Sequence, residues 1–379
     1  MSYADYLDTW TDSLDGILKE TTVENYRKKI NLYIKPYIGN KRLCSISKDD
    51  VRELLKTLAT NGCKGSDNAL ADTTLSVVKG IIQKSLSQAV EDKLLIENPI
   101  TGKLQTPSAD NILPDKPAKK KPHVYIKQDM IDEIFGRFSE GTASHIPMML
   151  GYKCGLRIGE AYAVTWDDID FQRGTITVNK QVQWHQTITV DRDSPNRRRP
   201  RGEESEYGTW YLTTPKYNSV RTIRIDTELA ELLIREKERQ MLNEQMYADR
   251  YIHYHADNAG AIRIGSGENE IKFVNVRFDG EFISPRTMQH TSRVIHDKIG
   301  FKEFDFHSLR HTHATMLAEN GATPMYVKNR LGHKNVEVTL RVYYHYTEKM
   351  DSAGNDVLME MFNKSSTFCE AQESTIEHE

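Results

Sequence analysis

A proline- and lysine-rich stretch at residues 107–122 interrupts the hydrophobic pattern of this 379-residue chain. Such a composition favours an extended linker over a packed element. The chain also exceeds the size, about 250–300 residues, at which a single hydrophobic core stops growing. The sequence therefore predicts a first domain at residues 1–106, the linker, a second domain at 123–362 and an acidic tail at 363–379.

The first hundred residues carry the hydrophobic spacing of helices. Aromatic and apolar side chains recur every three to four residues from Tyr3 to Leu14 and again beyond residue 25. The pattern predicts a helical domain built from four helices. The helix boundaries that we predict are an N-cap at Thr21 or Thr22, an end at Pro36 with Gly39, an N-cap at Ser47 and a stop at Asn98-Pro99.

Residues 123–362 mix strand and helix patterns. Thr175–Val178 and Val220–Ile225 alternate with period two, as half-buried antiparallel strands do. Helical spacing returns over Thr227–Met246, and an irregular or strand-bearing insertion covers about 251 to 283. Helices resume from Pro285, so we expect a mixed α+β domain.

Charge and cysteine usage limit the classes of partner. The net charge of −3 by itself argues against a polyanionic partner, but Lys119–Lys121 and Arg197–Arg201 concentrate positive charge. We expect the lysine run to cross DNA phosphates, whereas backbone contact and disorder are equally good interpretations of the arginine run. The four cysteines include no Cys-x-x-Cys pair, so neither a zinc knuckle nor a disulfide framework is expected.

The N-terminus and the hydropathy of the chain indicate a soluble protein. Acidic residues stand where a signal peptide needs an apolar core, and no apolar run approaches the roughly 20 residues that span a bilayer. We expect a cytoplasmic protein without membrane contact.

Two arginines stand in segments suited to holding a phosphate. Arg157 opens a segment, Ile158 to Val164, that has a helical pattern, so its guanidinium lies near free backbone N–H groups. Arg310 lies in a second helix, with His307 one turn before it on the same face. Two guanidinium groups would orient a phosphodiester and stabilise its pentacoordinate transition state, which metal ions do in many other nucleases.

The nucleophile must then come from the protein. A tyrosine phenol suits this role because its pKa of about 10 makes it a better leaving group than an alcohol when the bond is remade. The phosphodiester energy is kept, so joining needs no ATP. Because the two arginines do the work of metal ions, we expect neither a metal nor a cofactor.

Five short motifs occur in an order that resembles the tyrosine recombinases, specifically integrases of the phage and conjugative-transposon type. The resemblance covers about residues 3 to 362. It implies an all-α N-terminal core-binding domain plus a mixed α+β catalytic domain of the DNA breaking-rejoining type. The motifs are Gly155-Leu156-Arg157-Ile158-Gly159-Glu160, Thr214-Pro215-Lys216, His307-Ser308-Leu309-Arg310-His311, Leu331-Gly332-His333 and Tyr343-Tyr344-His345.

The resemblance implies a role for six residues. Arg157 and Arg310 bind the scissile phosphate, and Tyr343 attacks it to give a 3′-phosphotyrosine. Lys216, at the tip of a hairpin between Trp210–Leu212 and Ile223–Ile225, protonates the departing 5′-oxygen as general acid. His307 and His333 assist by hydrogen bonding and proton transfer.

Some assignments leave alternatives open. The Tyr-x-His spacing selects Tyr343, with Tyr344 as the alternative nucleophile. The density of His307, His311 and His313 suggests zinc, but no nearby cysteine or carboxylate completes a tetrahedral set. We therefore interpret His311 and His313 as structural.

The resemblance implies a site-specific recombinase that integrates and excises a mobile element through a Holliday junction. It would act as a homotetramer on double-stranded DNA attachment sites, with excisionase and DNA-bending proteins as accessory partners. The segment Asp356–Phe362 would dock on a neighbouring protomer. The rival hypotheses are type IB topoisomerase-like relaxation and a catalytically idle DNA-binding regulator. An arm-binding domain, with which many relatives begin, is not visible here, so the chain is either truncated or lacks one.

Overall fold

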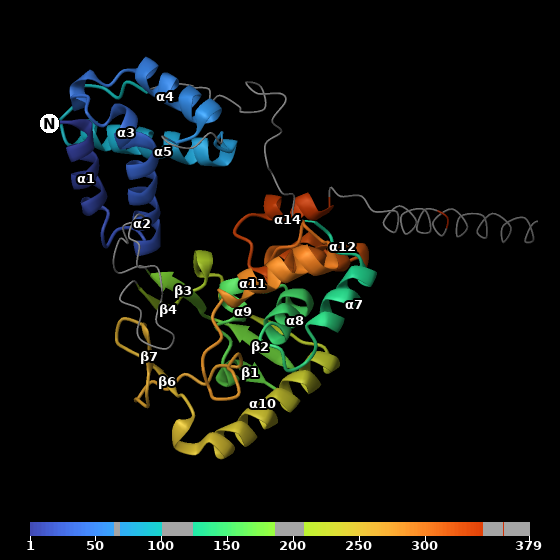
Figure 1. The fold of residues 1–379 in the computed structure, drawn as a ribbon. Helices are drawn as coiled ribbons and strands as arrows, with labels where there is room; N and C mark the ends of the chain where they lie inside the picture. Colours follow the sequence, from blue (N-terminus) through green and yellow to red (C-terminus); the bar gives the residue numbers. More distant parts are fainter. Residues whose placement is uncertain (64–68, 101–123, 186–207, 344–358, 360–379) are drawn as a thin grey trace, which may run out of the picture. The chain divides into compact units, whose positions relative to one another are not determined.

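The computed structural model describes residues 1–63, 69–100, 124–185, 208–343 and 359. Contacts divide the chain into two compact units, Met1–Lys121 and Pro122–Glu379 (Figure 1). Several predicted features lie outside the described residues, namely the linker at 107–122, the Arg197–Arg201 run, Tyr344, all of Asp356–Phe362 except Met359, and the tail at 363–379.

The first unit is built from helices. Its second helix begins at Glu20 after Lys19, so the predicted cap at Thr21 or Thr22 is wrong. A π-helical turn, Ile30–Ile34, continues the second helix into a short third helix that ends before Gly39. Pro36 lies in the first turn of this third helix, where a backbone N–H is not needed for an intrahelical hydrogen bond. The helices are α1 (Tyr3–Ser13), α2 (Glu20–Lys29), α3 (Lys35–Ile38), α4 (Lys48–Asn61) and α5 (Asp72–Glu91).

Helices α4 and α5 supply much of the first unit's core. Ser47 caps α4 as predicted, in a reciprocal capping box with Asp50. Leu55 of α4 and Ile82 of α5 are fully buried in one apolar cluster. Helix α5 ends at Glu91, several residues before the predicted stop at Asn98-Pro99, because Lys93 takes a left-handed conformation there.

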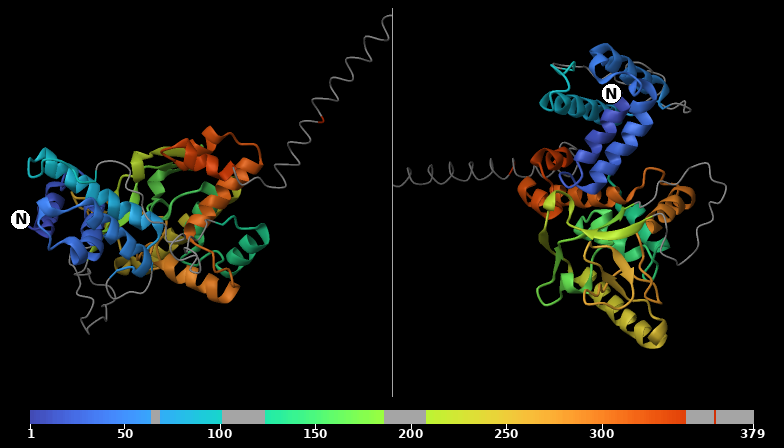
Figure 2. Two further views of the ribbon diagram at one scale, coloured as in Figure 1. Left: turned by 90° about the horizontal axis from the view of Figure 1, so that it is seen from above. Right: turned by 90° about the vertical axis from the view of Figure 1, so that its left-hand side faces the viewer.

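The second unit combines helices with small antiparallel sheets (Figures 1 and 2). The figures show α10 on the side of this unit opposite α12 and α14. Its helices are α7 (Gln128–Arg137), α8 (His145–Cys154), α9 (Ile158–Ala161), α10 (Thr227–Tyr247), α11 (Thr287–Val294), α12 (Phe306–Glu319), α13 (Pro324–Leu331) and α14 (Val336–Tyr343). Its strands are β1 (Ile169–Asp170), β2 (Thr175–Val178), β3 (Gln181–His185), β4 (Thr209–Thr213), β5 (Arg221–Arg224), β6 (Tyr254–Ala256) and β7 (Ile262–Ile264).

Strands β2 to β5 form two antiparallel pairs that belong to separate sheets. Strand β2 pairs with β5, and β3 pairs with β4. The strands on either side of Lys216 are β4 and β5. They therefore pair with β3 and β2, respectively, and not with each other. The predicted hairpin with Lys216 at its tip is wrong, because a period-two pattern identifies strands without identifying their partners. Lys216 instead lies in the segment 214–220, which connects β4 to β5 and which we call the bulge.

Helices α8 and α12 pack together at the centre of the second unit. Met148, Leu150 and Cys154 of α8 are buried against the same apolar cluster as Leu309 of α12. Gly155 ends α8 with a φ of +66°, and a Cβ there would come within 2.5 Å of Leu331 Cδ2. The tight turn at Gly155 brings the chain directly to Arg157.

Candidate active site

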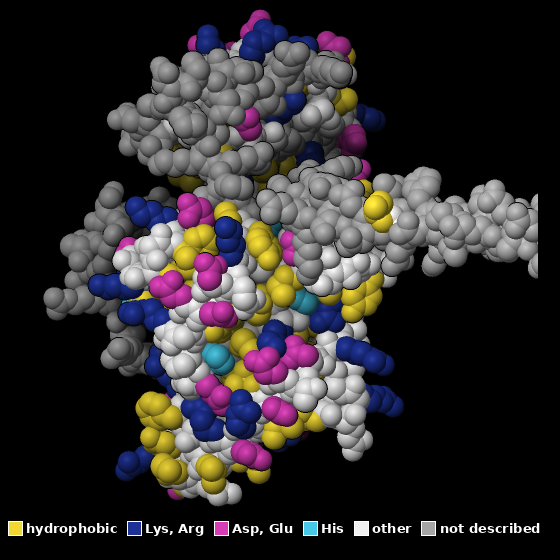
Figure 3. All heavy atoms as spheres, turned by 90° about the vertical axis from the view of Figure 1, so that its right-hand side faces the viewer, with side chains coloured by type: hydrophobic (Ala, Val, Ile, Leu, Met, Phe, Trp, Pro, Cys, Tyr) yellow, Lys and Arg dark blue, Asp and Glu magenta, His cyan; other side chains and the backbone are white. Residues whose placement is uncertain are grey.

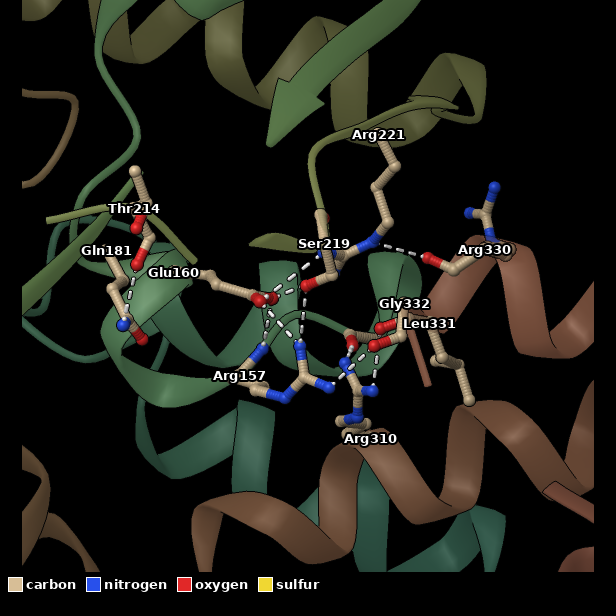
Figure 4. A network of polar contacts seen from close by, with 11 residues as sticks. Arg157, Glu160, Gln181, Thr214, Ser219, Arg221, Arg310, Arg330, Leu331 and Gly332 are labelled. Carbon is tan, nitrogen blue, oxygen red and sulfur yellow. Dashed lines mark hydrogen bonds and ion pairs between the residues drawn. The ribbon is translucent and has the colours of Figure 1, made fainter. Parts of the chain in front are cut away.

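The three central motifs of the sequence analysis meet in the second unit (Figure 4). Arg157 precedes α9, Arg310 lies in α12, and Leu331-Gly332-His333 joins α13 to α14. Helix α9 ends at Ala161 and not at Val164 as predicted, so it is a single turn. Any affinity for phosphate at this place must come mainly from the guanidinium groups.

Arg310 is almost completely buried, with 2 % of its surface exposed. Its Nη1 donates to the Gly155 carbonyl at 2.6 Å and its Nη2 to the Leu331 carbonyl at 2.7 Å. The Nε has no partner among the described residues. Burial, with the charges of Arg157 and Arg221, lowers the pKa of Arg310 well below its usual value. The site therefore contains a cation that lacks a full complement of negative charge.

Arg157 reaches the same turn from the other side. Its Nη2 donates to the Gly332 carbonyl at 2.8 Å, next to the Leu331 carbonyl that Arg310 contacts. Its Nη1 donates to Glu160 Oε1 at 2.8 Å and to Ser219 Oγ at 3.4 Å. Both guanidinium groups thus lie against two consecutive peptide groups.

Glu160 is the carboxylate of the cluster and has no exposed side-chain surface. Burial would raise the pKa of Glu160, but hydrogen bonds and charges from Arg221 and Arg157 hold it below its usual value. Arg221 donates its Nη2 to Glu160 Oε2 at 2.8 Å. Arg157 and Arg221 form ion pairs with this carboxylate, and Arg310 interacts with it through its charge alone, so the described cluster has positive charge left for an anion.

The surface of the second unit differs from this interior. Figure 3 shows lysine and arginine side chains interspersed with aspartate and glutamate side chains on the coloured part of one face. The excess positive charge of the cluster is therefore buried within a surface of mixed charge, where an anion interacts more strongly than in open water.

His333 follows the turn and is partly buried. Burial, together with Arg310 and Arg157, lowers the pKa of His333 to about 3, so the ring is neutral at pH 7. His333 Nδ1 shares a hydrogen bond of 2.9 Å with Thr339 Oγ1 of α14. His307 is exposed in the first turn of α12, and its charge contributes to lowering the pKa of His333.

Lys216 is exposed in the bulge 214–220, and its ammonium lies 5.2 Å from the centre of the Tyr217 ring. Lys334, one residue beyond His333, lies 5.6 Å from the same ring. Tyr217 and Asn218 have φ angles of +63° and +51°, a conformation that costs free energy in residues with a side chain. Ser219 joins this bulge to Arg157.

Tyr343 is the last residue of α14, four residues beyond the buried Thr339 that bonds His333. The described contacts thus connect the helix that carries Tyr343 to the arginine cluster through His333. The side chain of Tyr343 lies outside what the structure describes.

The other histidines of α12 have different surroundings. His313 is 8 % exposed and accepts a hydrogen bond at 3.0 Å from Arg330 Nε. Burial, followed by the charge of Arg330, lowers the pKa of His313 to about 3. Within the described ranges, His, Cys, Asp and Glu side chains form no group of three or more that could hold a metal ion.

Arg221 was not among the site residues predicted from the sequence. The strand alternation contained the signal, because Arg221 and Ile223 occupy the same face of β5 and Ile223 is buried. An arginine on the inner face of a strand requires an acidic partner, which here is Glu160.

Among the helices of the described segments, none is both long enough and apolar enough to cross a membrane.

Residues 205–350 match the phage integrase family, and residues 2–59 match the phage integrase N-terminal SAM-like domain. The first match includes Lys216, His307, Arg310, His333 and Tyr343 but not Arg157.

Individual proteins give the same result. The chain is 25% identical over 292 residues to a tyrosine recombinase XerC-like protein of Caldanaerobacter subterraneus subsp. tengcongensis. This match covers 76% of the chain and 66% of that relative, so the chain spans slightly less than two thirds of the relative's length.

Two solved structures share the fold. The Tn1549 transposon integrase in complex with a circular intermediate DNA has a TM-score of 0.65 at 18% identity, with 94% of this chain and 99% of that chain covered. A lambda integrase tetramer bound to a Holliday junction has a TM-score of 0.57 at 15% identity, with coverage of 90% and 77%. With its helical first unit and its mixed second unit, the chain belongs to the phage integrase family of tyrosine recombinases.

Proposed function

We propose that this protein is a site-specific DNA recombinase that integrates and excises a mobile element. The observation that carries the proposal is the convergence of Arg157 and Arg310 on the carbonyls of Gly332 and Leu331. Two guanidinium groups from distant parts of the chain lie side by side, and among the described residues one carboxylate, Glu160, neutralises them. A phosphodiester supplies the missing negative charge and accepts hydrogen bonds from both groups.

In the proposed reaction the Tyr343 oxygen attacks the scissile phosphorus. The new bond is the 3′-phosphotyrosine, and the bond between phosphorus and the 5′-oxygen breaks. Lys216 gives a proton to the departing 5′-oxygen. A 5′-hydroxyl of the partner strand then attacks the phosphotyrosine, displaces Tyr343 and restores the phosphodiester.

The arginine cluster stabilises the charge that develops in this reaction. Arg310 has five N–H groups, and two of them donate to carbonyls, which leaves donors for the phosphate. Neutral His333 can hydrogen-bond a phosphate oxygen, and His307 at the start of α12 assists. The proposed chemistry needs neither a metal ion nor ATP, since guanidinium groups supply the positive charge and the bond energy is conserved.

The assembly follows from the same proposal. Residues 1–106 form the core-binding domain, and residues 123–362 form the catalytic domain. A homotetramer joins two double-stranded attachment sites through a Holliday junction, and the segment Asp356–Phe362 docks on a neighbouring protomer. Excisionase and DNA-bending proteins are the accessory partners that we expect. The names of the relatives favour recombination over topoisomerase-like relaxation or a catalytically idle regulator.

Replacement of Tyr343 by Phe tests the nucleophile. On a nicked attachment-site substrate that traps the covalent intermediate, the wild-type protein should form a DNA adduct and Tyr343→Phe should form none. Tyr344→Phe is the matched control, because it removes the neighbouring hydroxyl, and it should still form the adduct. Single-site DNA binding should persist in both variants. An adduct in Tyr343→Phe that disappears in Tyr344→Phe would show that the nucleophile assignment is wrong.

A further inference from the structure

Arg221, the first residue of β5, contacts three segments that carry proposed site residues (Figure 4). Its Nη2 donates to Glu160 Oε2 at 2.8 Å, beside Arg157. Its Nη1 donates to the Ser219 carbonyl at 3.1 Å, within the bulge that holds Lys216. Its Nε donates to the Arg330 carbonyl at 2.7 Å, in the last turn of the helix that leads to His333.

These contacts are made in the interior. The side chain of Arg221 is 7% exposed, and that of Glu160 is fully buried. A guanidinium group can reach three partners in fixed directions because its donors form a rigid planar fork. An ammonium group has no such fork, so a lysine at this position cannot make all three contacts.

Packing around Gly332 shows how closely these segments approach. Gly332 has a φ of +68°, and a Cβ there would lie 2.9 Å from Ser219 Cβ and 3.1 Å from Arg221 Nη1. The bulge, Arg221 and the turn before His333 are therefore in direct contact. A shift of one segment must move the others.

We propose that Arg221 is a positioning residue that fixes the Lys216 bulge relative to the phosphate-binding Arg157. This inference rests on the proposed recombinase function. Arg221 acts through the Ser219 carbonyl on the bulge and through Glu160 on Arg157, and it needs no contact with DNA. Without Arg221, the strained turn at Tyr217 and Asn218 loses a tether, and Lys216 is held less firmly at the leaving oxygen.

The test compares two DNA substrates in single-turnover cleavage. One has the ordinary phosphodiester, and in the other sulphur replaces the bridging 5′-oxygen at the scissile phosphate. A thiolate leaves without a proton because a thiol has a pKa near 8.5, far below that of an alcohol. A defect in the placement of Lys216 is therefore relieved on the sulphur substrate, whereas a defect in phosphate binding persists.

Arg239→Ala is the matched control for the Arg221 variants. Arg239 also holds both oxygens of a buried glutamate, Glu236, at 2.8 and 2.6 Å. It lies on α10, on the side of the unit opposite α12. Arg239→Ala should cleave both substrates at the wild-type rate.

Arg221→Lys should cleave the ordinary substrate about 10²-fold more slowly, the size of effect that a small misplacement of reacting groups produces. Each variant's loss of cleavage rate on the ordinary substrate is compared with its loss on the sulphur substrate. The sulphur substrate should restore part of the rate lost in Arg221→Lys, nearly all of the rate lost in Lys216→Ala, and none of the rate lost in Arg157→Ala. Arg221→Lys should match Arg239→Ala in thermal unfolding and in single-site DNA binding.

A wild-type cleavage rate for Arg221→Lys would overturn the inference, and so would an equal loss on both substrates. Unfolding of both Arg221→Lys and Arg221→Ala, with Arg239→Ala folded, would assign Arg221 to the stability of the core and also overturn it. These results are distinct from a failure of the proposed function, in which the wild-type protein forms no adduct or Tyr343→Phe still forms one.

Discussion

The interiors of the two units differ in the buried charge that they contain. Among the described residues of the first unit, the buried polar side chains are Thr11 and Ser85, which are neutral and hydrogen-bonded. In the second unit Arg310 and Glu160 are as deeply buried as the apolar core. Burying a charge without full compensation destabilises a protein, so a chain keeps one where function requires it. This difference supports the proposal that the buried charges of Arg310 and Glu160 serve the chemistry of the second unit.

Arg310→Met should separate these two roles most clearly. The substitution keeps the apolar volume and removes a buried cation whose pKa is lowered by burial. Cleavage should fall about 10²–10³-fold, the effect of losing one donor to a transition-state oxyanion. The free energy of unfolding should change little, because the loss of hydrogen bonds to the Gly155 and Leu331 carbonyls is offset by the removal of a buried cation that lacks full compensation.

The counterpart in the first unit is Leu55→Ala, which should cost about 2–5 kcal/mol of unfolding free energy. Single-turnover cleavage and urea unfolding give both quantities for both variants. A stability loss in Arg310→Met as large as that in Leu55→Ala would remove the distinction between the two interiors.

Gly332→Ala tests the crowding at the turn that both arginines contact. Gly332 and Gly321 both have positive φ angles, +68° and +79°, but a Cβ meets close neighbours only at Gly332. Both alanine variants should lose about 1 kcal/mol or more of stability from the unfavourable backbone conformation. Gly332→Ala should also slow cleavage by roughly tenfold or more, given how sharply rates depend on placement. Equal cleavage by the two variants would contradict the account.

Acidification should destabilise the second unit first. The pKa values of His313 and His333 are lowered to about 3, chiefly by burial, whereas unfolded histidines titrate near 6.5. The unfolded state therefore binds more protons, so stability that is present above about pH 6.5 is lost as the pH falls toward 3.

The first unit lacks this source of acid sensitivity. Residues 1–121 contain no histidine, and the lowered pKa of Asp50, which follows chiefly from its hydrogen bond to Lys41, affects stability only below about pH 4. Hydrogen exchange at pH 7, 5.5 and 4 should show loss of protection in the second unit alone. Equal loss in both units would exclude the buried histidines as the cause.

The smallest expected effect is that of Ser47→Ala in the first unit. It removes the side-chain oxygen that accepts from Asp50 N at the start of α4 and should cost about 1 kcal/mol. Thermal unfolding should show this loss, while cleavage per folded molecule stays at the wild-type value. A cleavage defect at saturating DNA would show that the first unit also influences the chemistry.

The sequence predicted those features that depend on local spacing. Helical periodicity located α4 with its cap at Ser47, and period-two alternation located β2. Features that depend on distant partners were missed, since the strands beside Lys216 pair with β2 and β3 and not with each other. The motifs supplied Arg157 and Arg310. Arg221 was missed because its contact with Glu160 joins two segments that are far apart in the sequence, and the linear pattern does not show that they meet.

The most direct test of the central claim is a structure of Tyr343→Phe bound to an uncleaved attachment-site DNA. The account predicts one phosphate between the guanidinium groups of Arg157 and Arg310, within hydrogen-bond distance of both and opposite residue 343. A complex in which the DNA binds specifically but no phosphate contacts Arg310 would contradict it.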